Sequence, residues 1–502
     1  MSDYRRLVGN TLATFSGRIV SALLALVLST LLFRWLGPSL YGLWSFFFVL
    51  LSYSSVVDLG ISTTIERFVA RSKFEGDRQA IENSLNLCVT FAVFLSVFLE
   101  FVLVLLPESL WRRASSNDLR MVCNVFPLCL LLTNVGTVAG AGLAGVQRMG
   151  RLNFIRSAAN FIRTLLVVAL AAAGVRRLDV LLLAYSAAGS LAAFACWQEL
   201  EKQIGPLRFR PLYFRREMAG EYLRFGSAVQ TATLSYQAGD QLFRLLIGGR
   251  YGLAAMGYYD LGARIAFVVR SFAGALLATM VPFGTEKQLG EGPSGITRLH
   301  RFSVKYLALF VLPTSAVVLY YSREIIDLWL RGAAGSGAVL AIFRILLLGN
   351  AVAVLGGPAA MIGRSAGRPQ TEAAGTFVGV ALGLALAAAA PGLVAAVVLY
   401  AIGSFGAAVM IWFRLWRVFG FETGTAWDLL RVVAWSLLVV GLTAVLDRLA
   451  GAVVPRGPGW SAMLRWAACG GLSLAAVLPV VWTTGLLSLE EKQFWRRSLA
   501  LR

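Results

Sequence analysis

The chain has 502 residues, of which 58% are hydrophobic and 14% charged, and its mean hydropathy is +0.72. Soluble domains contain roughly 45–50% apolar and about 25% charged residues, so this composition excludes a water-soluble globular protein. The formal net charge of +20 would suit a protein that binds nucleic acid. Here, however, the basic residues lie mostly between apolar runs, where Lys and Arg orient membrane spans. A membrane protein is therefore expected, with the lipid bilayer and not nucleic acid as its surroundings.

The apolar runs predict about 14 transmembrane helices, because crossing ~30 Å of hydrocarbon takes about 20 residues of helix. The first run is too long for a cleaved signal peptide and carries Arg18. The expected fold class is an all-α polytopic membrane protein. The runs occupy residues 10–33, 40–62, 81–106, 119–144, 153–173, 180–199, 222–246, 252–282, 302–321, 338–361, 371–390, 393–413, 427–447 and 461–485.

The loops between these runs indicate the orientation of the chain. Lys and Arg are more numerous on the side that contains both termini, which predicts that both termini are cytoplasmic. The longest loop, 200–221, is basic and belongs to this side. Since every loop is short, a catalytic domain outside the membrane is not expected, and this disfavours membrane glycosyltransferases and polysaccharide polymerases.

Cysteine and histidine usage disfavours metal and redox chemistry. The five cysteines lie in apolar runs and form no Cys-x-x-Cys pair, which is typical of packing residues. His300 is the only histidine, so a histidine cluster cannot form within the chain. Neither a metal nor a cofactor is expected, and the lack of a P-loop pattern disfavours direct use of ATP.

A weak internal repeat indicates duplication of a six-helix unit, as is common among transporters. The first copy contains Leu32-Phe33-Arg34 and Tyr41-Gly42-Leu43, and the second contains Leu242-Phe243-Arg244 and Tyr251-Gly252-Leu253 at the same offset. We therefore expect two pseudo-symmetric lobes of six helices and two accessory helices. The predicted boundaries are 1–205 for the N-terminal lobe, 206–420 for the C-terminal lobe and 421–502 for helices 13 and 14.

Motifs in the first third of the chain resemble the opening of the bacterial polysaccharide flippases. The matching segments are Phe33-Arg34-Trp35-Leu36-Gly37-Pro38, Tyr41-Gly42-Leu43-Trp44, Asp58-Leu59-Gly60-Ile61 and Glu66-Arg67-Phe68-Val69-Ala70. These flippases are the Wzx-type members of the multidrug/oligosaccharidyl-lipid/polysaccharide exporter superfamily. The resemblance implies a transporter, not an enzyme, that moves an undecaprenyl-pyrophosphate-linked oligosaccharide across the bacterial inner membrane by alternating access. It also implies a role in making O-antigen, capsule or exopolysaccharide, with glycan polymerase and chain-length regulator proteins as partners.

Nine cations lie inside the predicted spans, and each would cost about 2.5–3.5 kcal/mol at a span centre facing lipid. Those near span ends can extend to the interface. We expect the deeper ones to line a wet cavity or to pair with carboxylates. The nine are Arg18, Arg156, Arg163, Arg224, Arg264, Arg270, Lys305, Arg344 and Arg465.

Polar residues recur at helical spacing along several spans, so that they share one face of each helix. In the fifth span this face carries Asn153, Arg156, Asn160 and Arg163. Two interpretations fit: a hydrophilic passage, or hydrogen bonds that hold neighbouring helices together. For Arg264 the second interpretation is an ion pair with Asp260, one helical turn away.

The passage interpretation assigns candidate residues to an anionic lipid-linked sugar. Arginine donates paired hydrogen bonds to phosphate, and amide side chains suit sugar hydroxyls. The resemblance places spans one, two, seven and eight around the cavity. The substrate-binding candidates are Arg18, Arg264, Arg270, Lys305, Arg163, Asn160, Gln237 and Gln241.

An inside-negative potential favours export of an anion by ~2.3 kcal/mol per charge and 100 mV. Exchange with H⁺ or Na⁺ would add to this driving force. The ion-coupling candidates are Asp58, Glu66, Asp240 and Asp260. For Asp58, which precedes Gly60, a break in the second span is the alternative.

Three other functions remain as alternatives. A cation-coupled multidrug antiporter of the same superfamily would need a cavity rich in carboxylates and poor in arginine. A membrane enzyme of glycan assembly would need catalytic carboxylates on a sizeable external loop. A scaffold of glycan assembly would tolerate the loss of the intramembrane arginines.

Overall fold

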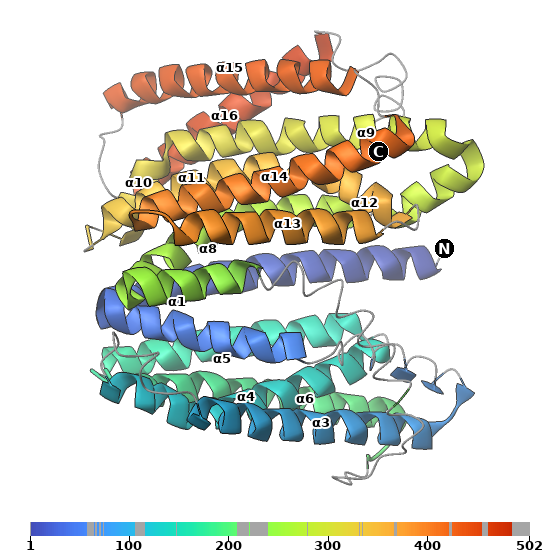
Figure 1. The fold of residues 1–502 in the computed structure, drawn as a ribbon, viewed down its shortest axis with the longest axis vertical. Coiled ribbons are helices and arrows are strands. Elements are labelled where there is room, and N and C mark those ends of the chain that lie inside the picture. Colours follow the sequence, from blue (N-terminus) through green and yellow to red (C-terminus); the bar gives the residue numbers. More distant parts are fainter. Residues whose placement is uncertain are drawn as a thin grey trace. The chain divides into compact units, whose positions relative to one another are not determined.

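The computed structural model describes most of the chain. The described residues are 2–57, 65, 68–69, 72–73, 75–105, 116–146, 148–207, 220, 239–278, 280–330, 332–333, 335–365, 369–420, 424–453 and 460–483. Every regular element in these ranges is a helix (Figure 1), which confirms the all-α class. In chain order the helices are α1 (Ser2–Val57), α3 (Arg78–Leu105), α4 (Ser116–Gly145), α5 (Met149–Ala172), α6 (Leu178–Ile204), α8 (Leu253–Ala278), α9 (Met280–Tyr320), α10 (Ser322–Leu330), α11 (Ser336–Val354), α12 (Gly357–Ser365), α13 (Pro369–Ala388), α14 (Leu393–Phe419), α15 (Gly424–Val453) and α16 (Trp460–Thr483). Residues 239–251 are also helical.

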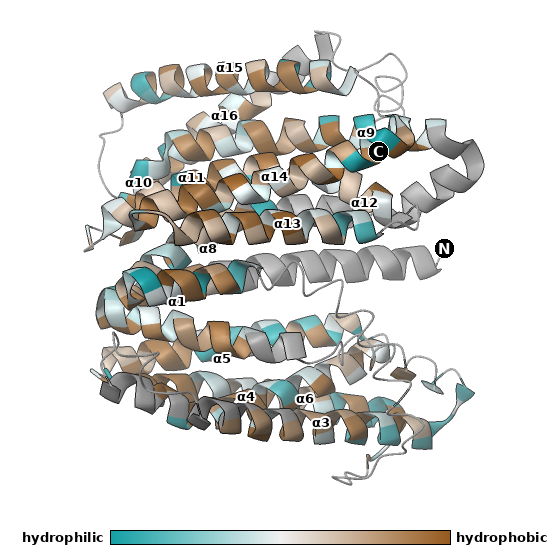
Figure 2. Ribbon diagram, viewed as in Figure 1, coloured by the Kyte–Doolittle hydropathy of each residue, from teal (hydrophilic) through white to brown (hydrophobic). Residues whose placement is uncertain are grey.

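Ten helices in the described part are long and apolar enough to cross a membrane. Helix α1 contains the predicted span 10–33 and residues 40–57 of the predicted span 40–62, whose last residues lie outside the described ranges. The other predicted spans, 222–246, 252–282 and 461–485, include residues outside the described ranges. Hydrophobic residues cover the middle of α3 and α13, while hydrophilic residues gather toward one end of each (Figure 2). The chain is thus a multi-pass membrane protein.

Helix α1 breaks where its two predicted spans meet. Gly37 has φ 78° and ψ 172°, a backbone conformation with positive φ that residues other than glycine rarely adopt. Pro38 follows and cannot donate a backbone hydrogen bond to the preceding turn. Figure 1 shows α1 folding back on itself, so the two spans form an antiparallel pair.

Three boundaries differ from the sequence expectation. The run 338–361 is not one helix, because turn residues Leu355 and Gly356 separate α11 from α12. Helix α9 begins at Met280, well before the apolar run 302–321, so the polar segment ahead of that run is helical as well. Helix α10 lies where a loop was expected. Hydropathy detects the apolar part of a helix and misses its polar extensions.

The described chain divides into two compact units, Met1–Leu261 and Gly262–Arg502. In the first unit, α3, α4 and α6 enclose a core that includes Leu85, Leu143 and Leu200, each at most 1% exposed. In the second unit, Val432 and Val439 of α15 pack on α9 beside Ala308 and Val317. The predicted lobes 1–205, 206–420 and 421–502 stay a prediction.

Candidate functional site

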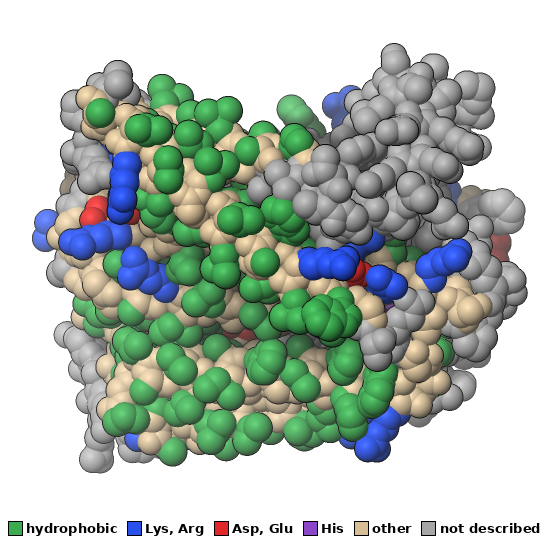
Figure 3. All heavy atoms as spheres, turned by 90° about the horizontal axis from the view of Figure 1, so that it is seen from above, with side chains coloured by type: hydrophobic (Ala, Val, Ile, Leu, Met, Phe, Trp, Pro, Cys, Tyr) green, Lys and Arg blue, Asp and Glu red, His purple; other side chains and the backbone are tan. Residues whose placement is uncertain are grey.

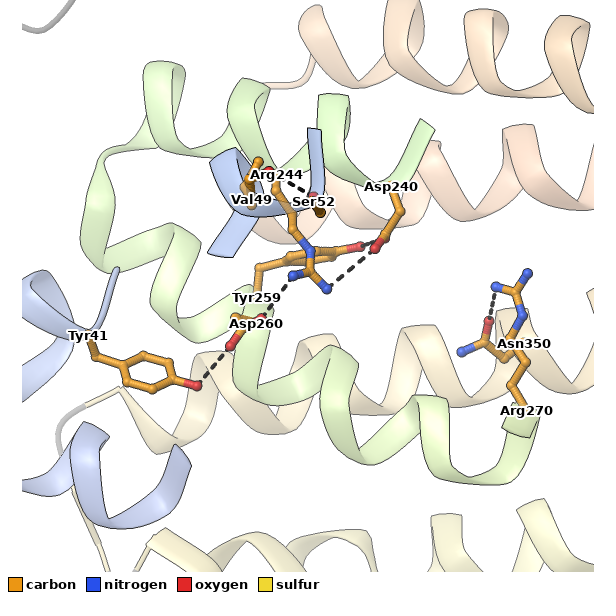
Figure 4. A network of polar contacts seen from close by, with 9 residues as sticks. All are labelled: Tyr41, Val49, Ser52, Asp240, Arg244, Tyr259, Asp260, Arg270 and Asn350. Atoms are coloured by element: carbon orange, nitrogen blue, oxygen red, sulfur yellow. Dashed lines mark hydrogen bonds and ion pairs between the residues drawn. The ribbon is translucent and has the colours of Figure 1, made fainter. Parts of the chain in front are cut away.

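The first unit contains a network of charged and tyrosine side chains centred on Asp260 of α8 (Figure 4). The Asp260 carboxylate is 1% exposed and accepts hydrogen bonds from two groups. Tyr41 of α1 donates its hydroxyl to Oδ2 at 2.8 Å, and Arg244 donates Nη1 to Oδ1 at 3.0 Å. A buried carboxylate is costly unless it is paired and hydrogen-bonded, and these two donors satisfy it.

The same guanidinium also reaches a second carboxylate. Arg244 Nη2 lies 3.3 Å from Asp240 Oδ2, one helical turn away, and Tyr259 donates its hydroxyl to Asp240 Oδ1 at 3.0 Å. The guanidinium lies 5.9 Å from the centre of the Tyr259 ring. The Asp240 side chain is 46% exposed, whereas that of Asp260 is 1% exposed. Arg244 therefore neutralises a buried carboxylate and contacts a half-exposed one.

Local packing explains why these residues meet. Helices α1 and α8 approach so closely that a Cβ on Gly42 would overlap the backbone carbonyl of Leu253. The repeated phenylalanines pack on the network tyrosines: Phe33 lies edge-on to Tyr41 at 5.5 Å, and Phe243 lies edge-on to Tyr259 at 5.2 Å. The network thus rests on both copies of the repeated Leu-Phe-Arg motif.

A second polar cluster in the first unit surrounds Arg163 of α5. Arg163 Nη1 donates to Asn160 Oδ1 at 3.4 Å, and its guanidinium lies 4.8 Å from the centre of the Tyr185 ring on α6. Tyr185 lies edge-on to Trp44 at 5.7 Å and to Phe48 at 5.1 Å, both on α1. An arginine, an amide and three aromatic rings therefore converge from α1, α5 and α6.

The second unit holds Arg270 against an amide as well. Arg270 Nη1 of α8 donates to Asn350 Oδ1 of α11 at 3.4 Å (Figure 4). Arg344 of α11 donates Nε to Ser322 Oγ at 2.8 Å. Lys305 of α9 is 6% exposed, with its amine 5.5 Å from the centre of the Tyr306 ring.

Two charged contacts join α15 and α16 to α9. Arg301, in the middle of α9, donates Nε to Asp428 near the start of α15 at 2.7 Å. Near the end of α15, Asp447 accepts a hydrogen bond at 3.3 Å from Tyr321, which directly follows α9, and pairs with Arg465 of α16 at 3.1 Å. Helices α9 and α15 therefore run parallel and α16 antiparallel to them, as the alternation of the predicted spans requires.

On the face shown in Figure 3, Lys and Arg side chains gather toward its two sides, with hydrophobic side chains between them.

The structure brings some predicted site residues together. Arg163 meets Asn160, and Asp240 and Asp260 share Arg244, a residue that is not among the predicted site residues. The i, i+4 spacing of Asp240 and Arg244 was the available signal for that pair. Gln241 lies beside Asp240 in the sequence, and its buried Oε1 has no hydrogen-bond partner among the described residues. Arg264 lies on α8.

Other candidates fall outside the described part of the chain. They are the side chain of Arg18 and the residues Gln237, Asp58 and Glu66. Among the described residues, no group of three or more His, Cys, Asp or Glu side chains is placed to hold a metal ion.

The family model of the polysaccharide biosynthesis proteins matches residues 31–332. The chain belongs to this family. A further relative is an uncharacterized membrane protein of Haemophilus influenzae, 37% identical over 78 residues, which are 16% of this chain and 19% of that protein. The chain thus covers about a fifth of that relative.

Two solved structures share the fold of this polysaccharide biosynthesis protein. The lipid II flippase MurJ in an inward closed conformation superposes with a TM-score of 0.72 at 13% identity, covering 96% of this chain and 100% of MurJ. An inward-facing multidrug resistance transporter of the MATE family superposes with a TM-score of 0.61 at 15% identity, covering 84% of this chain and 98% of that one. These proteins are transporters and flippases, not enzymes.

Proposed function

We propose that this protein is a flippase that moves an undecaprenyl-pyrophosphate-linked oligosaccharide from the inner to the outer leaflet of the bacterial cytoplasmic membrane. Membership of the polysaccharide biosynthesis family supports a role in making a surface glycan. The fold shared with a lipid II flippase supports movement of a lipid-linked head group. In this proposal the predicted lobes 1–205 and 206–420 alternate access to the two faces, helices α15 and α16 are accessory, and both termini are cytoplasmic.

The observation that carries the proposal is the partner of Arg163. Its Nη1 donates to the side-chain oxygen of Asn160 at 3.4 Å, and no carboxylate among the described residues forms an ion pair with it. An amide accepts the hydrogen bond without neutralising the charge of the guanidinium. A pyrophosphate carries the opposite charge, and its oxygens match the planar donors of arginine. A passage for cationic drugs would favour carboxylates at such positions.

For the driving force, the two carboxylates of the Asp260 network differ in what they offer a coupling ion. Asp260 is buried and held by Arg244 and Tyr41. Asp240 is 46% exposed, so H⁺ or Na⁺ can reach it without breaking a buried ion pair. We therefore place Asp240 ahead of Asp260 as the coupling residue. Asp58 and Glu66 remain candidates of the proposal.

The test is complementation of a flippase-null strain that makes the matching glycan. We expect the wild type to restore surface glycan. Arg163→Gln and Arg270→Gln should lower its amount at least about tenfold, since a hydrogen bond to a charged group contributes roughly 1.5–3 kcal/mol. The control is Arg323→Gln, whose side chain is 76% exposed. All variants are compared at equal abundance in the membrane.

Failure of the wild type to restore the glycan of its own genome would overturn the flippase proposal. Full activity of both arginine variants would instead favour a scaffold role. If Arg323→Gln lowered the amount of surface glycan as much as Arg163→Gln does, the assay would respond to net charge and not to this site.

A further inference from the structure

Arg163 of α5 lies against α6, between the ring of Tyr185 and the backbone of Gly189. Its guanidinium faces the Tyr185 ring at 4.8 Å. One turn later on α6, Gly189 presents its backbone to the same group. A Cβ at Gly189 would overlap Arg163 Nη2 and would lie only 3.1 Å from Cζ and 3.3 Å from Nε. Any side chain at residue 189 would therefore displace the guanidinium.

The charge of Arg163 has no carboxylate partner among the described residues. Its Nη1 donates a hydrogen bond to the Asn160 amide, and its buried Nε has no hydrogen-bond partner in the described part of the chain. Arginine at the centre of a span costs about 2.5–3.5 kcal/mol on the insertion scale, and a buried donor left unsatisfied costs about 1–3 kcal/mol. A ligand that brings oxyanions would offset both costs.

The surroundings of Arg163 strengthen such an interaction. Trp44 is 3% exposed, and it packs on Phe48 at 5.2 Å and on Tyr185 at 5.7 Å. These rings exclude water from one side of the guanidinium. Charge interactions grow as the local dielectric constant falls, so an anion bound here gains more than it would at the surface.

We infer that Gly189 and Tyr185 form a seat that orients Arg163 to bind a phosphate oxyanion, with Gly189 as a positioning residue. The seat fixes the plane of the guanidinium, and the plane determines which phosphate oxygens receive paired hydrogen bonds. This inference rests on the proposed function, since the pyrophosphate of the lipid-linked sugar is the ligand in transport. The phosphate of a phospholipid offers similar oxygens, so the experiment separates the two.

The experiment measures binding to the purified full-length chain in nanodiscs of neutral lipid. The probes are undecaprenyl pyrophosphate, phosphatidylglycerol and inorganic pyrophosphate. We expect the wild type to prefer undecaprenyl pyrophosphate, and Gly189→Ala and Arg163→Gln each to weaken this binding about tenfold or more. Because the glycine acts only through the arginine, the double variant should bind no more weakly than Arg163→Gln alone.

A matched glycine provides the control for packing. Gly136 of α4 also faces α6, and a Cβ there would lie 3.4 Å from the Cβ of Ala193, an ordinary contact. Gly136→Ala should keep wild-type affinity. If Gly189→Ala does not yield folded protein, Arg163→Lys replaces it, because lysine retains the charge but lacks the planar donors. We expect about tenfold weaker binding for this variant too.

The outcomes separate the inference from the proposed function. Wild-type affinity of Gly189→Ala, or of Arg163→Lys where that variant is used, would overturn the seat and leave the flippase proposal standing. Additive losses in the double variant would also overturn it. Equal binding of phosphatidylglycerol would overturn the assignment to the lipid-linked pyrophosphate. The proposed function fails on a different result: the wild type does not restore surface glycan in the complementation experiment.

Discussion

Two arginines of the first unit, Arg244 and Arg163, meet opposite kinds of partner. Arg244 lies between the carboxylates of Asp240 and Asp260, and a tyrosine hydroxyl donates to each of these (Figure 4). Arg163 has one amide and one aromatic ring. The protein itself neutralises Arg244, whereas Arg163 keeps a charge that a ligand can use.

The second unit also contains a buried arginine with a carboxylate partner. Arg465 is 5% exposed and pairs with Asp447, so it holds α16 to α15. A buried arginine is therefore not by itself a sign of a substrate passage. Its partner distinguishes a contact that joins helices from one that can bind an anion.

The largest expected effect comes from removing the buried carboxylate of the first network. Asp260→Asn should lower the free energy of unfolding by about 3 kcal/mol, because breaking a buried ion pair is strongly destabilising and Arg244 then keeps only the half-exposed Asp240 as a charged partner. Thermal unfolding in detergent measures the change. The matched variant is Asp240→Asn, whose side chain is 46% exposed, and we expect a loss below about 1 kcal/mol there. Equal losses of the free energy of unfolding would contradict the distinction between the buried Asp260 and the half-exposed Asp240.

Part of this arrangement follows from the sequence alone. Apolar runs predicted the helices, and helical spacing put Asn160 on the same face as Arg163, since residues three or four apart are neighbours on a helix. The Tyr41–Asp260 contact joins residues 219 positions apart, so it depends on which helices pack together. Nothing in a single sequence gives that packing. The contacts of Tyr185 and Gly189 with Arg163 likewise depend on the packing of α5 against α6.

The second prediction removes the difference between the two arginines. Asn160→Asp places a carboxylate where Arg163 now meets an amide, so the guanidinium gains a partner like that of Arg244. We expect binding of undecaprenyl pyrophosphate and restoration of surface glycan to fall about tenfold or more, because the substrate must then compete with an internal anion. Stability without ligand should be retained or raised, since the buried charge becomes paired.

The control for this substitution lies on the same stripe of α5. Asn153→Asp adds the same charge about two turns away and should leave binding within about twofold of the wild type, because the interaction weakens with distance and screening. If both variants lose binding equally, total charge and not the partner of Arg163 governs the ligand. If Asn160→Asp binds as the wild type does, Arg163 is not the anion site.

The smallest expected effect compares the two tyrosines that donate to the carboxylates of Arg244. Tyr41→Phe removes the hydroxyl that donates to Asp260, where burial leaves no water to replace it. We expect a loss of about 1.5 kcal/mol, the lower end for a hydrogen bond to a charged group. Tyr259→Phe removes the hydroxyl at Asp240, where water can take its place, and should cost less than about 0.5 kcal/mol. Both variants keep the aromatic ring and its packing on Phe33 or Phe243, so thermal unfolding reports the hydroxyl alone. A larger loss of stability in Tyr259→Phe than in Tyr41→Phe would show that the contacts of Asp240 hold the network together. Asp240 would then be a structural residue and not a site for a coupling ion.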